Sequence, residues 1–100
     1  MIREPQLTPT TMRVLEALLE APNSAGADIV KSTGLATGTV YPILLRLEGA
    51  RWLSSCWEEG EPSTLGRPRR RFYSVTAEGA RAARQAALKL HEVAGRLAWS

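Results

Sequence analysis

A mainly α-helical domain with one small β-hairpin is the fold class that this sequence predicts. Three observations indicate it: apolar residues recur at helical spacing in several stretches, two short stretches alternate apolar and polar residues, and a loop rich in Gly, Pro and Arg joins those two stretches. The predicted order is three helices, a strand, a basic loop, a second strand and a last helix. This is the layout of a winged helix-turn-helix with an added C-terminal helix.

Size and composition limit what the chain can be. One hundred residues with a net charge of +3 make one small domain. A domain of this length leaves much of its apolar surface uncovered, which favours association with a second copy. The sequence has one Cys, hence no internal disulfide, and no apolar run long enough for a membrane span or a signal core. We therefore expect a cytoplasmic protein that does not associate with membranes.

The first two helices are predicted from capping residues and a turn. Thr8 is placed to cap the first helix, with Pro9 at the first helical position, where its missing N–H costs nothing. A short second helix is expected over about 25–33, and a turn that begins with Gly34 leads to the third helix, at about 37–48. Two short helices joined by a Gly-containing turn are typical of a helix-turn-helix.

The third helix is expected to begin with Thr37 as its cap and to end at Gly49. One side of it carries four apolar residues, Val40, Ile43, Leu44 and Leu47. Pro42 lies in its second turn, where it removes one backbone hydrogen bond and should bend or loosen the start of the helix.

Two strands with a basic loop between them are predicted after the third helix. The first is expected over 52–58 and the second over 72–75, because apolar and polar residues alternate in both. The loop from Gly60 to Gly66 is followed by four arginines within the five positions from 67 to 71. A net charge of +3 is too small to bind polyanions everywhere, so this cluster would focus such binding.

The last helix is predicted to begin at Thr76 and to run almost to the end of the chain. Small and apolar residues recur along it at intervals of three and four: Ala80, Ala83, Ala87, Leu90, Ala94 and Leu97. Such a stripe is the seam of a contact with a second helix or of packing on the helix's own domain. Because the winged core is nearly complete without it, we favour a homodimer seam. The chain then divides into a winged helix-turn-helix, 1–76, and a dimerisation helix, 77–100, within one compact domain.

Double-stranded DNA is the partner that this arrangement indicates. Recognition helices read base edges mainly with their first turns, and a basic hairpin lies against phosphates or enters the minor groove. The candidate DNA-binding residues are Thr37, Gly38, Thr39, Tyr41, Arg46, Arg67, Arg69 and Arg70. Hydroxyls suit phosphates, the Thr methyl suits thymine, and Gly38 allows close approach. Two alternatives remain: Arg46 on a solvated helix face, and a basic loop that only keeps the protein soluble.

Several motifs resemble the PadR family of bacterial transcriptional regulators. They are GTVYPILLRLE (residues 38–48), WEE (57–59), GRPR (66–69) and FYSVTAEG (72–79), and the resemblance covers residues 7–100. It implies a winged-helix homodimer, usually a repressor, that binds a pseudo-palindromic operator and dimerises through its C-terminal helix. Residues 26–29 read GADI where the family commonly has GYEI, and the chain ends after one C-terminal helix, as in the family's short branch.

An effector and other chemistry are less clearly indicated. Some short members of the PadR family bind flat aromatic compounds between protomers, so the resemblance suggests Trp99 as a contact for a small aromatic effector; interface packing is the alternative. Cys56 and His91 lack the partners that a redox or metal site needs. We predict no catalytic site, no metal and no cofactor. The competing function is a winged-helix adaptor whose basic hairpin meets an acidic protein.

Overall fold

The computed structural model describes residues 5–99, and the side chains of residues 5–96. Its elements in chain order are α1 (Pro9–Glu20), β1 (Ser24–Ala25), α2 (Gly26–Thr33), α3 (Thr37–Gly49), β2 (Leu53–Trp57), α4 (Pro62–Leu65), β3 (Arg71–Val75) and α5 (Ala77–Trp99). The mainly helical winged helix-turn-helix predicted from the sequence is confirmed.

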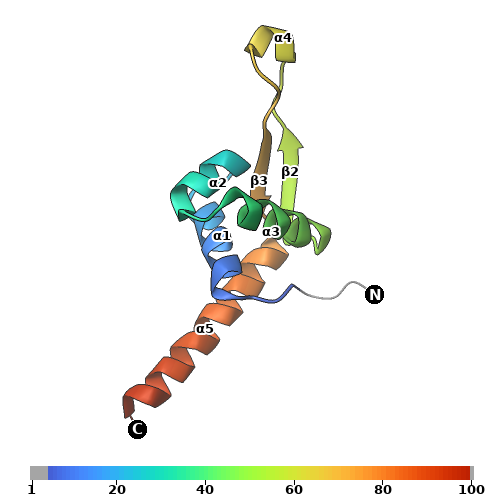
Figure 1. The fold of residues 1–100 in the computed structure, drawn as a ribbon. Coiled ribbons are helices and arrows are strands. Elements are labelled where there is room, and N and C mark those ends of the chain that lie inside the picture. The colour runs from blue at the N-terminus through green and yellow to red at the C-terminus, as the bar shows by residue number, and fades with distance from the viewer. Residues whose placement is uncertain (1–4, 100) are drawn as a thin grey trace.

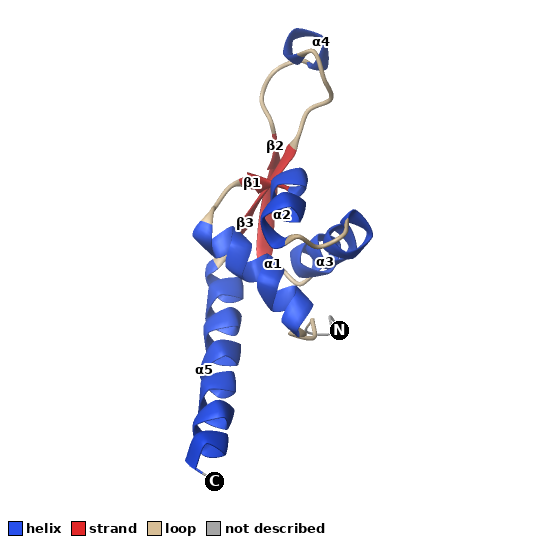
Figure 2. Ribbon diagram, turned by 60° about the vertical axis from the view of Figure 1, so that its left-hand side comes forward, coloured by secondary structure: helices blue, strands red, loops and turns tan. Residues whose placement is uncertain are grey.

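The molecule is elongated because two elements project from the helical body in opposite directions (Figure 1). Helices α1, α2 and α3 form the body, and its longest dimension with the projections is 61 Å against 32 and 21 Å. The hairpin of β2 and β3, with the short helix α4 at its tip, forms the wing, residues 53–75 (Figure 2). Helix α5 leaves the body on the other side (Figure 1).

The sheet has three antiparallel strands in the order β1-β3-β2, so the predicted hairpin is correct but incomplete. Ser55 faces Tyr73 in the hairpin, and Ser24 faces Tyr73 from the other side. Strand β1 was not predicted because two residues are too few to show an alternating pattern. It attaches the start of α2 to the wing, so the sheet joins the helical body to the hairpin.

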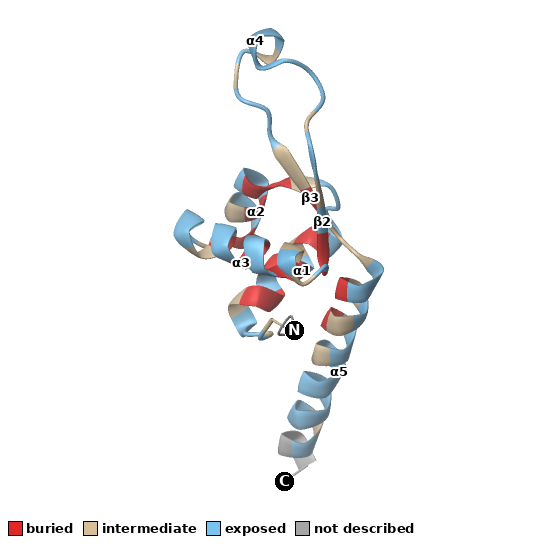
Figure 3. Ribbon diagram, turned by 90° about the vertical axis from the view of Figure 1, so that its right-hand side faces the viewer, coloured by how far each residue is buried: buried red, intermediate tan, exposed pale blue. Residues whose placement is uncertain are grey.

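One apolar core lies where α1, α3 and the sheet meet (Figure 3). The predicted apolar side of α3 is confirmed, since Val40, Ile43, Leu44 and Leu47 are all buried. Leu15 and Leu18 of α1 pack into the same cluster, together with Trp52, which directly precedes the wing. The outward side of α3 is left free by this packing.

The two predicted helix caps have different outcomes. Thr8 caps α1 as expected, because its hydroxyl accepts a hydrogen bond from the backbone N–H of Thr11 at 3.2 Å. Thr37 does not cap α3: it is the first helical residue, and Ala36 in extended conformation precedes it without a side-chain hydrogen bond. The helix continues through Pro42, where only one backbone bond is lost, and includes Gly49.

The start of helix α5 is capped by the Thr76 side chain and packs closely against the backbone of Trp52. Thr76 accepts a hydrogen bond from the N–H of Gly79 at 3.1 Å and donates one to the carbonyl of Arg51 at 2.8 Å. Gly79 lies directly against the backbone of Trp52: a Cβ on it would lie 3.0 Å from the Trp52 Cα and closer still to the Trp52 carbonyl oxygen. The beginning of α5 is therefore fixed to the start of the wing.

The predicted seam along α5 divides into two parts. Ala83 is only 4% exposed and packs in the core of its own chain, so its assignment to a dimer interface is corrected. Ala80 is half-buried, whereas Ala87, Leu90 and Ala94 are exposed. The first turns of α5 thus belong to the domain itself, and only the later turns project beyond it. Leu97 lies in α5 with its side chain outside the described residues.

We predict that Gly79→Ala lowers the free energy of unfolding by about 1–3 kcal/mol, because the new methyl group meets the fixed backbone of Trp52. Urea denaturation at one protein concentration measures it. Gly95→Ala in the same helix is the matched control, since a Cβ there meets nothing within 4 Å. It should raise stability by up to about 1 kcal/mol. Equal effects of the two substitutions would contradict the close contact.

Candidate nucleic-acid interface

The outward side of α3 carries most of the residues predicted for DNA binding. Thr37, Gly38, Tyr41 and Arg46 are exposed, and Thr39 is half-buried. Because the opposite side of α3 is buried in the core, these residues face outward. The first turns of α3 therefore offer hydroxyl groups and bare backbone to the outside.

Tyr41 is held in place by the start of α2. A Cβ on Gly26 would lie 2.7 Å from the outer atoms of the Tyr41 ring, so a larger residue there would displace the ring from this position. The ring nevertheless stays 43% exposed. Gly26 thus has a packing reason that a single sequence does not reveal, and it positions one of the predicted DNA contacts.

The four wing arginines divide into two groups. Arg67 forms a two-point ion pair with Glu58, at 2.6 and 2.9 Å. Glu58 also accepts a hydrogen bond from the backbone N–H of Arg70 at 3.3 Å, which closes the base of the loop. Within the described part of the chain the exposed side chains of Arg69 and Arg70 form no salt bridge. Of the three predicted wing contacts, these two have no paired carboxylate in that part of the chain, although the charge of Arg70 still acts on Glu58.

The pKa of Glu58 records the strength of this pair. The hydrogen bonds and charge of Arg67 lower it from 4.5 to about 2, helped by the backbone N–H and the charge of Arg70 and opposed by partial desolvation. A carboxyl group with a lowered pKa stabilises the fold above its unfolded value of 4.5, and this contribution is lost as the pH falls through about 2. At neutral pH the pair is fully formed.

Arg71 connects the wing to α3, and the sequence did not mark it as a separate site. Its guanidinium donates to the Glu48 carboxylate at 3.0 and 3.2 Å and to the Ser55 hydroxyl at 2.8 Å. It also lies over the Trp57 ring, 5.3 Å from the centroid. Ser55 in turn donates to Glu48. A residue of β3 is thereby bonded to the end of α3 and to the neighbouring strand, so the helix and the wing keep one orientation.

A cleft of about 500 Å³ lies between α2, α3 and the wing. Its lining includes Tyr41 from α3, Arg69 and Arg70 from the loop, and Tyr73 from β3. Burial raises the pKa of Tyr73, so its hydroxyl stays protonated at neutral pH. The guanidinium groups of Arg69 and Arg70 together with the phenol of the exposed Tyr41 can bind a phosphate. The cleft thus brings the predicted contacts from the helix and the wing together.

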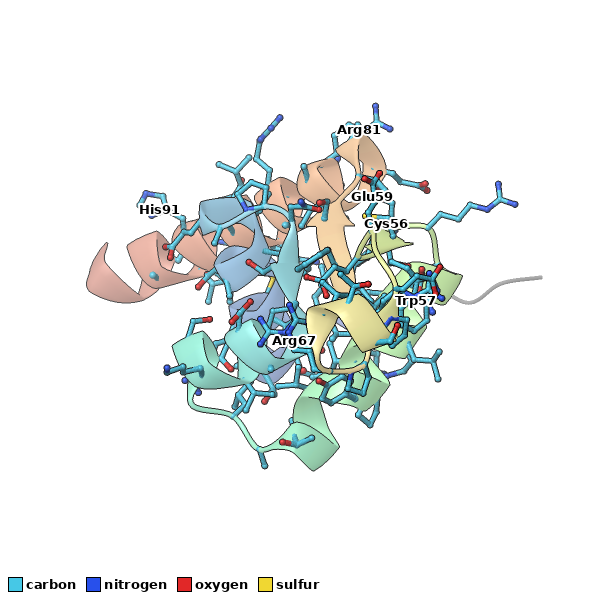
Figure 4. All side chains as sticks on the ribbon, turned by 90° about the horizontal axis from the view of Figure 1, so that it is seen from above. Cys56, Trp57, Glu59, Arg67, Arg81 and His91 are labelled. Atoms are coloured by element: carbon cyan, nitrogen blue, oxygen red, sulfur yellow. The ribbon has the colours of Figure 1, made fainter. Side chains whose placement is uncertain are left out.

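Figure 4 shows the remaining singled-out residues from above. Trp57 and Arg67 lie on the wing, whereas His91 lies far along α5, apart from Cys56. Among the described residues no three His, Cys, Asp or Glu side chains are grouped to hold a metal ion. None of the described helices is long and apolar enough to cross a membrane. Trp99, the predicted effector contact, lies in α5, but its side chain is outside the described residues.

A helix-turn-helix with an exposed recognition helix and a basic wing defines the class of winged-helix transcription regulators. A model of the Transcriptional regulator PadR-like family matches residues 14–85, and the chain belongs to that family. The resemblance noted in the sequence motifs is thereby confirmed.

Solved structures share this fold. A PadR family regulator from Eggerthella lenta DSM 2243 is 28% identical with a TM-score of 0.74, over 88% of this chain and 77% of that one. A PadR-like transcription factor from Bacteroides fragilis is 23% identical with a TM-score of 0.72, over 86% and 84%. The regulator PcaV from Streptomyces coelicolor, solved with its natural ligand, is 21% identical with a TM-score of 0.75, over 91% of this chain and 60% of its own. No curated protein sequence matches the chain.

We predict that Arg67→Gln raises the pKa of Glu58 from about 2 toward 4.5, because the substitution removes the largest cause of its lowering. An NMR titration that follows the side-chain carboxyl carbon of Glu58 measures it. Arg69→Gln is the matched control: it removes the same charge two positions away, outside the contacts of Glu58, and should leave this pKa unchanged. An unshifted pKa in the Arg67 variant would contradict the ion pair.

Proposed function

We propose that the protein is a sequence-specific DNA-binding repressor that acts as a homodimer. Membership in the PadR-like family supports DNA binding in general. The observation that carries the specific proposal is the cleft in which Tyr41 of the recognition helix and the free arginines Arg69 and Arg70 of the wing meet. Helix α3 would enter the major groove, and the wing would bind the adjacent backbone.

The wing arginines are proposed to bind phosphates. Exposed guanidinium groups without a carboxylate partner release counterions from DNA when they bind, which makes affinity fall with salt. Arg67, already neutralised by Glu58, would contribute to the shape of the loop more than to its charge. This assignment refines the initial set of three wing contacts to two.

We predict that the double substitution Arg69→Gln and Arg70→Gln weakens binding to all DNA sequences and lowers the slope of log affinity against log salt by about 2, roughly one per arginine. Fluorescence anisotropy with a labelled operator at several salt concentrations measures both. Arg96→Gln, an exposed arginine on α5, is the control and should change neither. An unchanged slope in the double variant would refute phosphate binding by the wing.

A protein adaptor is the alternative, in which the wing meets an acidic partner. The same titration separates the two, since an adaptor would show no preference between operator and unrelated DNA. The preference of arginine over lysine in the wing suits bidentate phosphate contacts, which favours DNA.

The homodimer is proposed from the outer part of α5. The helix face that is buried at Ala83 and half-buried at Ala86 continues into Leu90 and Val93, which are 64% and 44% exposed. Among the described residues only Leu7 of the N-terminal segment lies near them, so much of their apolar surface stays exposed. A second copy related by a two-fold axis would cover both, and would place two α3 helices at half-sites about 10 base pairs apart. Such a dimer on a pseudo-palindromic operator would repress by occupying the promoter.

We predict that Leu90→Glu shifts the protein from twice the 10.9 kDa of one chain to a monomer, because it places a charge in the seam. Sedimentation velocity measures the mass. Leu88→Glu is the matched control: Leu88 is 59% exposed, but two residues along a helix turn it to roughly the opposite side. A monomeric wild-type protein, or equal behaviour of the two variants, would contradict the seam.

We also infer a small aromatic effector at this seam. A groove of about 340 Å³ runs beside it, lined by Leu7, Ala86, Lys89, Leu90 and Val93. Its apolar walls with one lysine suit a planar acid. Tryptophan fluorescence and DNA affinity that planar aromatic acids leave unchanged would refute an effector.

A further inference from the structure

The outward face of α3 is apolar along its centre. Successive helical residues are about 100° apart, so the residues opposite the buried side are fixed by the core. They are Gly38, Pro42, Leu45 and Gly49, and all four are exposed. The hydroxyl groups and charges noted above lie on the flanks of this line.

Leu45 is the most conspicuous of these residues. Its side chain is 73% exposed, more than that of any other large hydrophobic residue in the described part of the chain. It makes no contribution to the core, which is formed by its neighbours Leu44 and Leu47. The fold therefore gives no reason for a leucine at this position.

Gly38 adds a second, independent observation on the same line. A Cβ there would meet nothing within 4 Å, and its φ is not in the left-handed region. The fold would accept alanine, which has the higher helix propensity. A glycine that the fold does not need leaves bare backbone, which suits the close approach of another molecule to this face.

The charges around the face identify its occupant as a polyanion. Arg46 lies beside Leu45 on α3, and the free arginines Arg69 and Arg70 border the neighbouring cleft. An apolar strip with basic flanks fits the major groove of DNA, where phosphates border the base edges. In that groove the one apolar group is the 5-methyl of thymine.

We propose that Leu45 contacts the 5-methyl group of a thymine in each half-site and is a specificity-determining residue. The proposal rests on the proposed DNA-binding function and adds a base reader that the sequence analysis did not identify. It also accounts for specificity in a helix whose first turns lack the strong Arg–guanine and Asn–adenine pairings. Base-reading residues extend into the second and third turns of recognition helices in homeodomains, so the place of Leu45 in α3 is suitable.

The test combines operators that lack one thymine methyl group with a protein variant that lacks the Leu45 side chain. Each thymine of the footprinted operator is replaced in turn by deoxyuridine, which pairs identically but lacks the methyl group. At one position per half-site the wild-type affinity should fall by about fourfold per methyl group, the value of one buried methylene. The Leu45→Ala variant should bind the operator more weakly, and replacing thymine by deoxyuridine at that same position should not change its affinity. A double-mutant cycle reports this difference as a coupling between Leu45 and the methyl group.

Controls separate this proposal from the function on which it rests. Leu88→Ala, an exposed leucine on α5, should respond to deoxyuridine as the wild type does. 5-Methylcytosine placed at the coupled position should bind better than cytosine to the wild type only, because it carries the same methyl group. If the wild type binds its operator but no position couples to Leu45, this proposal alone is overturned. If the wild type shows no sequence-specific binding, both are overturned.

Discussion

The ion pair between Arg71 and Glu48 fixes the relation on which the rest of the structure depends, that of α3 to the wing. A half-exposed pair of this kind adds little free energy by itself. Its effect is directional, since Ser55 and the Trp57 ring hold the same guanidinium from two further sides. With β1 joining α2 to the sheet, the helix and the hairpin form one surface, which would lower the entropic cost of the proposed binding of DNA at two places.

The four arginines of the cluster at positions 67–71 have two different roles in the wing. Arg67 and Arg71 bond to carboxylates of their own chain and shape the wing, whereas Arg69 and Arg70 form no salt bridge within residues 5–96. Glu58, which looks unfavourable in a DNA-binding hairpin, closes the base of the loop and has its pKa lowered accordingly. The proposed interface thus combines two internal ion pairs, which shape the wing, with two exposed arginines. The outward face of α3, apolar at its centre, completes it.

Local signals predicted most of the fold, and contacts between distant residues account for what was missed. Thr8 and Pro9 identified the start of α1 because a helix cap depends only on residues close together in the sequence. The start of α3 was predicted correctly, but its cap was misplaced by one residue, since Ala36 receives the first backbone hydrogen bonds without any side-chain signal. The pairing of β1 with β3 and the bond from Arg71 to Glu48 depend on register and topology, which spacing along the chain does not reveal. Leu45 was missed because an apolar residue in an apolar helix resembles core until the buried side is known.

The measurement that tests the account most directly is a titration against DNA from upstream of the protein's own gene, at two salt concentrations, with unrelated DNA as competitor. For a sequence-specific dimer we expect tight binding that survives the competitor, weakens at the higher salt and protects two half-sites about one helical turn apart. Binding that disappears into the competitor at both salt concentrations would contradict a sequence-specific regulator of that promoter. It would favour the adaptor instead.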